Sequence, residues 1–209
     1  DPGRRLLVYL ASSPQVSPRE PDFVDSWVAA LRGASDLSLR EAQVLVRPHP
    51  RAKEIWRRHP RYGAGSTAGA GIALAMSKSV QSDQSLYDAL VHADAAVGLN
   101  TTAEIEAAIL GTPTYTVHVP AAAPGQSGSL HFSYLLDDNG GCVGAAETLP
   151  EHLRQLAWGL AGRIDRKRQR RFVEQFVRPR GIDVPVSPIL ADEIIALGQT
   201  DRLGDQGVG

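Results

Sequence analysis

Residues 85–117, SLYDALVHADAAVGLNTTAEIEAAILGTPTYTV, contain the pattern that decides the fold of this chain. The stretch is typical of a helix, a short strand, a polar loop, a second helix and a second strand, in that order. The apolar run 95–99 is long enough for a buried parallel strand and too short for a helix. It ends at a polar loop, which is the kind of junction where an open α/β sheet binds ligands.

The polar loop consists of Asn100, Thr101 and Thr102. Any of the three can cap the following helix, whose first N–H groups lack internal partners and carry about half a positive charge together. An anion fits there. Ordinary helix capping uses the same residue types, and on the pattern alone it is the more common explanation. Gly111 then ends the helix and Pro113 opens the next strand.

The rest of the chain repeats this alternation of strands and helices. Further apolar runs predict strands, and amphipathic stretches predict connecting helices; the strands are 4–11, 43–46, 72–76, 113–119 and 140–145, and the helices include 21–32 and 149–164. We therefore expect one α/β domain over residues 1–198, with a Rossmann-like, open, mostly parallel sheet of about six strands and helices on both faces. A short helix is expected at 188–197, and a flexible tail at 199–209.

The strand at 43–46 is followed by Arg47, Pro48, His49 and Pro50. Two prolines cannot continue a central strand, so His49 is expected in the loop at the ligand-binding edge of the sheet. There it can donate a hydrogen bond to phosphate, or act as an acid or base near neutral pH. The Arg47 guanidinium can bind two phosphate oxygens at once. A loop histidine without such neighbours is more often structural or merely exposed.

The stretch 85–117, preceded by VLVRPHP at 44–50, resembles the C-terminal domain of GT-B glycosyltransferases and their relatives over roughly two thirds of the chain. It is most similar to poly(glycerophosphate) glycerophosphotransferases and bacterial capsule-polysaccharide transferases. In the former, a hydroxyl pair opens a helix, a Glu follows four residues later, and the helix closes in Gly-x-Pro. The residues at those places are Thr101, Thr102, Glu106, Gly111 and Pro113. An acid precedes the pair in that family, whereas this chain has Leu99 and Asn100 there.

The resemblance implies a role for each matching residue. The backbone and hydroxyls of Thr101 and Thr102 would hold a phosphate, and Glu106 would accept hydrogen bonds from ribose hydroxyls. Glu104 lies two positions before Glu106, so the two carboxylates point to different faces of the helix. His49 and Arg47 would stabilise the charge that grows on the leaving phosphate.

Four further residues are candidates for nucleotide binding. The resemblance implies that the loop with Ser12 and Ser13 lies near the donor phosphates, and a simple surface turn is an equal alternative. Asn100 belongs to the central polar loop. His131 follows the Gly- and Pro-rich loop 120–128, which could fold over a bound nucleotide.

Composition excludes several functions. With 209 residues, of which 43% are hydrophobic, the chain can bury one domain, and its net charge of −1 argues against general nucleic-acid binding. A single cysteine, Cys142, excludes an internal disulfide and a cysteine-based zinc site. The sequence has no Asp-x-Asp pair and no obvious metal cluster, so neither a metal nor another cofactor is expected.

The chain is expected to be cytoplasmic and to be part of a longer protein. It has no apolar run near the roughly 18 residues of a membrane span, and it begins without a Met or an apolar signal segment. The basic run from Arg163 to Arg171 is interpreted as a solvated helix face. The alternative is peripheral contact with the anionic inner membrane, where each cation adds about 1 kcal/mol.

These observations favour the donor-nucleotide half of a GT-B-like, metal-independent transferase of a bacterial surface polysaccharide or teichoic-acid-like polymer. Its donor would be a CMP-, CDP- or UDP-linked sugar or polyol. The general base would come from a missing N-terminal acceptor domain, so the chain alone would bind nucleotide weakly and turn over nothing. One alternative is a sugar-nucleotide 2-epimerase, although that family has adjacent glycines where this chain has threonines. Another is a non-catalytic scaffold module that retains the fold.

Overall fold

The computed structural model describes residues 3–63, 71–76 and 84–204. The contacts within the chain divide it into two compact units, Asp1–Val173 and Glu174–Gly209. The described strands all belong to the first unit. Part of the expected tail, residues 205–209, lies outside the described residues.

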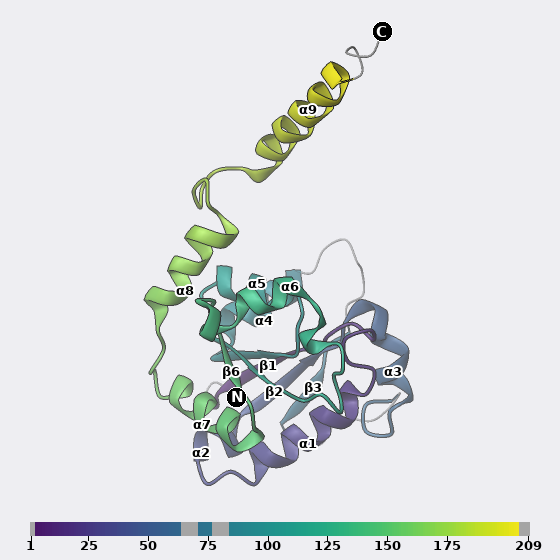
Figure 1. Cartoon of the computed structure of the whole chain (residues 1–209). Helices are drawn as coiled ribbons and strands as arrows, with labels where there is room; N and C mark the ends of the chain where they lie inside the picture. Colours follow the sequence, from purple (N-terminus) through teal and green to yellow (C-terminus); the bar gives the residue numbers. More distant parts are fainter. Residues whose placement is uncertain (1–2, 64–70, 77–83, 205–209) are drawn as a thin grey trace. The chain divides into compact units, whose positions relative to one another are not determined.

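The first unit is built on a six-stranded sheet with the order β3-β2-β1-β4-β5-β6 (Figure 1). Every neighbouring pair of these strands is parallel. The open, Rossmann-like α/β sheet expected from the sequence is therefore confirmed, and each strand lies within or next to an apolar run that predicted it. The strands are β1 Leu6–Leu10, β2 Gln43–Arg47, β3 Ile72–Leu74, β4 Ala95–Gly98, β5 Thr114–Val117 and β6 Val143–Ala146.

Helices connect the strands. Those of the first unit are α1 Glu20–Arg32, α2 Leu37–Arg40, α3 Lys53–Arg58, α4 Gln84–His92, α5 Ala103–Ile109, α6 Leu130–Leu135, α7 Leu149–Leu160 and α8 Arg166–Phe172, with short 3₁₀ turns η1 Pro50–Ala52, η2 Gln126–Gly128 and η3 Asp137–Asn139. A π-helical turn, η4, covers Val173–Val177, and α9 covers Val186–Gly204. The sequence did not predict α2, because a single turn is too short to show a helical period.

The last helix is longer than the sequence predicted. The expected helix at 188–197 lies inside α9, which begins at Val186 and continues to Gly204. Gly198 directly follows Leu197, but the helix continues through it, and residues 198–204 contain no proline that would end the helix.

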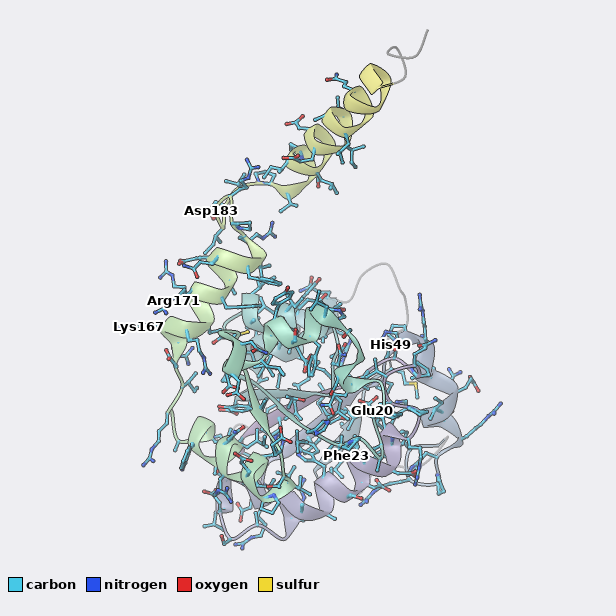
Figure 2. All side chains as sticks on the ribbon, in the orientation of Figure 1. Glu20, Phe23, His49, Lys167, Arg171 and Asp183 are labelled. Atoms are coloured by element: carbon cyan, nitrogen blue, oxygen red, sulfur yellow. The ribbon has the colours of Figure 1, made fainter. Side chains whose placement is uncertain are left out.

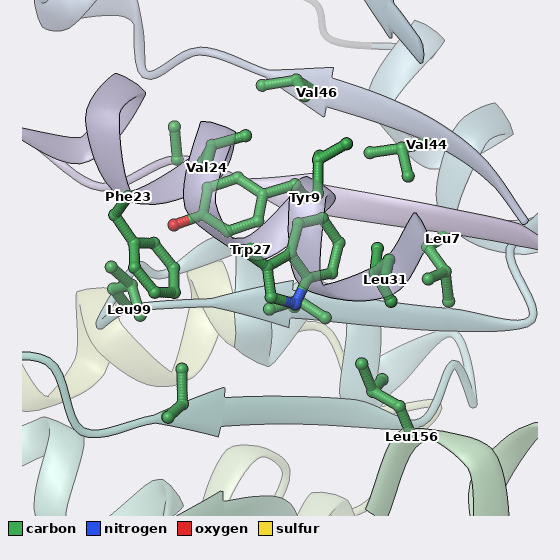
Figure 3. Packing of buried hydrophobic residues seen from close by; sticks show 14 of the residues in the cluster. Leu7, Tyr9, Phe23, Val24, Trp27, Leu31, Val44, Val46, Leu99 and Leu156 are labelled. Atoms are coloured by element: carbon green, nitrogen blue, oxygen red, sulfur yellow. The ribbon is translucent and has the colours of Figure 1, made fainter. Parts of the chain in front are cut away.

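The alternation of side chains along the strands produces two apolar layers. On one face, Leu7, Tyr9, Val44 and Val46 pack with Trp27 and other residues of α1, as Figure 3 shows. The opposite face of the sheet carries Val8, Leu10 and Ala96, which pack against Leu86 and Leu90 of α4 and Ala107 of α5. Successive side chains of a strand point to opposite faces of the sheet, so a strand that is apolar at every position must be covered by other elements on both faces. Helix α1 packs on one face and α5 on the other.

A buried histidine links α1, α7 and β5. The ring of Trp27 lies against Tyr9, with 5.5 Å between ring centroids, and its Nε1 donates to His152 Nε2 at 3.2 Å. Because Nε2 accepts, the proton of the neutral ring is on Nδ1, which lies 3.3 Å from the carbonyl oxygen of Thr116. Burial lowers the pKa of His152 to about 4.

This low pKa predicts acid sensitivity. The neutral His152 ring contributes its full stabilisation above the unfolded pKa near 6.5. This contribution to the free energy of unfolding is lost as the pH falls toward 4, at about 1.4 kcal/mol per pH unit. We expect the free energy of unfolding to fall by ~2 kcal/mol more between pH 7 and pH 5 in the natural protein than in His152→Gln. Urea unfolding at both pH values measures this, with the exposed His131→Gln as the control. An equal pH dependence in all three proteins contradicts the assignment.

Candidate functional site

The strand order reverses between β1 and β4. The chain leaves β1 through α1 toward β2 and leaves β4 through α5 toward β5, while Leu10 at the end of β1 is paired with Gly98 at the end of β4. In open α/β sheets, ligands bind outside the carboxyl ends of such a pair of strands.

A pocket of about 230 Å³ opens beside this reversal, at the carboxyl edge of the sheet. We call it the edge pocket. It brings together five residues that the sequence predicted as site residues: Arg47, His49, Thr101, Thr102 and Glu106. Its other lining residues are Leu10, Ala11, Pro48, Pro50, Leu86, Tyr87 and Ala103.

Volume alone does not distinguish the edge pocket. The described residues also form hollows of about 240, 280 and 500 Å³ elsewhere. The largest contains the Arg5–Asp94 ion pair, in which Nη1 and Oδ1 are 2.7 Å apart, and it lies at the amino end of the sheet. What distinguishes the edge pocket is the convergence of polar side chains at the carboxyl ends of the strands.

Arg47 forms one wall of the edge pocket. It is the last residue of β2, is 7% exposed, and donates from Nη1 to the Ser85 hydroxyl at 3.0 Å. Arginine stays charged at all relevant pH values, and its planar guanidinium matches two oxygens of a phosphate or carboxylate. The pocket therefore has a fixed positive group.

His49 caps the turn η1. Its Nδ1 accepts a hydrogen bond from the Arg51 N–H at 3.1 Å, so the proton of the neutral ring is on Nε2. Partial burial, and then the charge of Arg51, lower the pKa of His49 below its usual value. At neutral pH the side chain is thus a neutral Nε2–H donor, and Nδ1 is not available as a base in this conformation.

Some backbone amides at the start of α5 already have partners within the chain. The N–H groups of Glu104 and Ile105 already donate to the carbonyls of Thr101 and Thr102, at 3.1 and 3.0 Å. Thr102 is the N-cap residue, but its side chain makes no capping hydrogen bond. These amides are therefore already paired, and the Arg47 guanidinium, the His49 ring and the threonine hydroxyls of the pocket are further groups that can contact an anion.

Asn100 has a structural role in this loop. It is 4% exposed, and its Nδ2 donates to the Gln126 carbonyl at 2.8 Å and to the Ser129 hydroxyl at 2.7 Å. Its φ of +92° is in the left-handed region, which asparagine tolerates better than most residues. Asn100 ties the loop after β4 to residues 126–129, and it does not line the edge pocket.

Three other predicted site residues lie outside the edge pocket. Ser12 is fully buried, and its N–H donates to the Glu20 carboxyl group at 2.9 and 3.0 Å. Ser13 follows it and accepts from the Val16 N–H through its carbonyl. His131 is exposed on α6. The loop between β1 and α1 holds Ser12 against Glu20, and neither serine lines the edge pocket.

The sequence analysis did not predict that two acids at this edge of the sheet, Glu20 and Glu104, are buried. Glu20, labelled in Figure 2, is 1% exposed and accepts from the Tyr9 hydroxyl at 3.0 Å, while Glu104 is 0% exposed. Burial raises the pKa of Glu20 to about 7 and that of Glu104 to about 8. Gly98 leaves room for Glu104: a Cβ there would lie 2.8 Å from Glu104 Oε1, so a larger residue would have to displace this carboxyl group.

Most cations of α8 are exposed, but Arg168 is half-buried and its Nη1 lies 3.6 Å from Asp137 Oδ2. Lys167 and Arg171 are exposed, as Figure 2 shows, whereas Gln169 anchors the helix by donating to the Thr112 carbonyl at 2.9 Å. Within the described ranges, no helix combines the length and apolar composition that a membrane crossing requires. No group of three or more His, Cys, Asp or Glu side chains among those residues is arranged to hold a metal ion.

The chain is similar to solved glycosyltransferase structures. CalG4, the calicheamicin glycosyltransferase, shares 20% sequence identity with it at a TM-score of 0.51, over 96% of this chain and 45% of CalG4. SnogD from Streptomyces nogalater shares 17% identity at a TM-score of 0.45, over 93% of this chain and 44% of SnogD. No protein-family model matches the sequence, and no curated protein matches it.

The likeness to CalG4 shows a shared fold. This chain has the open, Rossmann-like α/β fold of one half of a GT-B glycosyltransferase, and it spans less than half of CalG4.

Asn100 makes side-chain hydrogen bonds to residues 126–129 and also adopts a positive φ, and substitution can separate these two contributions to stability. Asn100→Gly and Asn100→Ala both lose the hydrogen bonds to residues 126–129, but only alanine adds the strain of a positive φ, about 1 kcal/mol. We expect both variants to unfold at lower urea concentration than the natural protein, with Asn100→Ala the less stable by ~1 kcal/mol. Equal stability of the two variants contradicts this account.

Proposed function

We propose that this chain is the donor-nucleotide-binding half of a GT-B transferase. The observation that supports it best is the edge pocket, where Arg47, His49, Thr101, Thr102 and Glu106 come together from two separate parts of the sequence. The pocket lies at the carboxyl edge of the sheet, next to the reversal of strand order, where nucleotides bind in folds of this kind.

The basic side of the pocket fits a phosphate group. The guanidinium of Arg47 supplies a fixed charge, and the hydroxyls of Thr101 and Thr102 supply neutral donors. His49 donates through Nε2–H to an oxygen of the leaving phosphate. As the bond from the sugar or polyol to that phosphate breaks, negative charge grows on the phosphate oxygens, and these donors stabilise it without a metal ion.

Glu106 is the acidic group of the pocket and is proposed to bind the ribose. A carboxylate accepts from two neighbouring hydroxyls at once, which suits the ribose 2′- and 3′-OH. Glu104 is two positions away and is fully buried, so the two acids of α5 have different surroundings.

The donor class follows from the resemblance of residues 85–117 to glycerophosphotransferases and capsule-polysaccharide transferases. The donor is proposed to be a CMP-, CDP- or UDP-linked sugar or polyol, and the acceptor a bacterial surface polysaccharide or a teichoic-acid-like polymer. A general base for the acceptor hydroxyl is proposed to come from an N-terminal acceptor domain, so that this chain by itself binds nucleotide and does not transfer the sugar.

Nucleotide titration tests the proposal. We expect calorimetry with CMP, CDP, UDP and GDP to detect binding of at least one nucleotide in the millimolar range or tighter. Glu106→Ala should weaken that binding about tenfold, because a hydrogen bond to a charged group contributes about 1.5–3 kcal/mol. Glu41→Ala is the matched control, since Glu41 is an exposed acid at the end of α2, outside the edge pocket.

Two outcomes count against the proposal. The absence of heat with all four nucleotides at millimolar concentration would exclude nucleotide binding and would favour a scaffold module. An equal loss of affinity in Glu106→Ala and Glu41→Ala would remove the ribose assignment.

A further inference from the structure

Glu104 lies beneath the edge pocket and contacts its loop directly. The side chain is 0% exposed, and Oε2 accepts a hydrogen bond from the Thr101 N–H at 2.9 Å. Oε1 is buried and has no hydrogen-bond partner among the described residues. This oxygen lies over Gly98, where a Cβ would be 2.8 Å away. The acid therefore fills a space that the end of β4 leaves open for it.

The hydrogen bond to Thr101 determines where a pocket residue lies. Thr101 lines the edge pocket, and the residue before it, Asn100, has a positive φ that most residues avoid. A loop in such a conformation persists only where its surroundings hold it. The Asn100 side chain holds it from the side of residues 126–129, and the Glu104 carboxyl group holds it from below.

We propose that Glu104 is the positioning residue of the edge pocket: its buried carboxyl group holds the Asn100–Thr101 backbone and thereby places the hydroxyls that receive an anionic group. This inference rests on the proposed nucleotide-binding function for its ligand. The positioning of the loop, however, is measurable without any ligand.

The surroundings of Glu104 favour the neutral form. Glu20 of α1 is a second buried acid, and beyond the effect of burial its charge raises the pKa of Glu104 further. Burial chiefly raises the pKa of Tyr9 and of Cys142, and a charge on Glu104 would add to both shifts. No cation is among the groups that shift the pKa of Glu104, which burial chiefly raises to about 8. Hydrogen bonds from the backbone N–H groups of Thr101 and Asn100 lower the pKa of Glu104, but their effect is smaller than that of burial.

Ionisation of Glu104 would disturb the pocket in two ways. A buried carboxylate with one unpartnered oxygen is costly, so the loop would open to let water reach it. The new negative charge would also repel an anion at Thr101 and Thr102. Folding raises the pKa of Glu104 from 4.5 to about 8, so the folded state binds this proton more tightly than the unfolded state. The contribution of Glu104 to the free energy of unfolding is therefore complete below pH 4.5 and is lost as the pH rises through about 8. The pocket should therefore bind an anion best below pH 8.

The first measurement follows the loop without ligand. Glu104→Gln keeps an acceptor for the Thr101 N–H and cannot ionise, whereas Glu104→Ala removes the acceptor. We expect the Thr101 amide signal in ¹⁵N NMR spectra to titrate between pH 6 and 9 in the natural protein and not in Glu104→Gln. In Glu104→Ala, hydrogen exchange at Thr101 should be at least about tenfold faster, with Val97 in β4 unchanged. Unchanged exchange at Thr101 overturns the positioning role.

The second measurement uses UDP and CDP as probes at pH 7 and pH 9. We expect affinity to fall about tenfold more in the natural protein than in Glu104→Gln, as a nearby negative charge appears only in the former. Comparison of the two proteins removes the effect of the ionisation of the nucleotide itself. Glu41→Gln, at an exposed acid, should behave like the natural protein.

The outcomes separate this inference from the proposed function. Equal pH dependence of affinity in the natural protein and Glu104→Gln overturns the role of the neutral acid. If neither nucleotide binds to any variant, while the Thr101 amide titrates and exchanges as described, the positioning role is supported and the proposed function fails. If Glu104→Ala does not fold, the titration of Thr101 in the natural protein and in Glu104→Gln decides the question.

Discussion

The candidate site depends on the parallel pairing of β1 with β4. The chain leaves β1 for a helix on one face of the sheet and leaves β4 for a helix on the other face, as the packing of α1 and α5 shows. No crossover covers the carboxyl ends of these two strands, so the loops there present polar side chains to one another. Arg47 and His49 lie beside these loops because they follow β2, which is the neighbour of β1 in the sheet.

The same arrangement recurs after both central strands. The first helical turn that follows β1 contains Glu20, and the one that follows β4 contains Glu104. Each acid reaches back to a backbone N–H of its loop, Ser12 in one case and Thr101 in the other. A carboxyl group can hold a loop in this way where no water reaches it, provided that it keeps its proton, and burial favours the protonated form for both. Two buried acids at the carboxyl edge of the sheet are costly for folding, and such costs are typical of functional sites.

Much of the fold could be predicted from local patterns. Runs such as LLVYL in β1 and QVLVR in β2 are apolar on both sides of the chain, which is the pattern of a central parallel strand, and the structure has strands at both places. Gly111 ends α5 with a φ of +79°, as its place after the helix predicted. The short helix α2 was missed because its single turn depends on the Asp36 carboxylate, which accepts from the N–H groups of Ser38 and Leu39.

The sequence by itself determined the strands, the order in which helices follow them, and which residues stand at the ends of β2 and β4. These features depend on neighbours along the chain, so residue type and spacing are sufficient to predict them. Only the tertiary structure decided which of those polar residues share a pocket. Ser12 binds Glu20, Asn100 binds residues 126–129, and Glu104 binds the Thr101 N–H from a buried position. Arg47 and Glu106, by contrast, line one pocket. The direction of a side chain in a loop depends on contacts with distant segments, and a single sequence does not contain those distances.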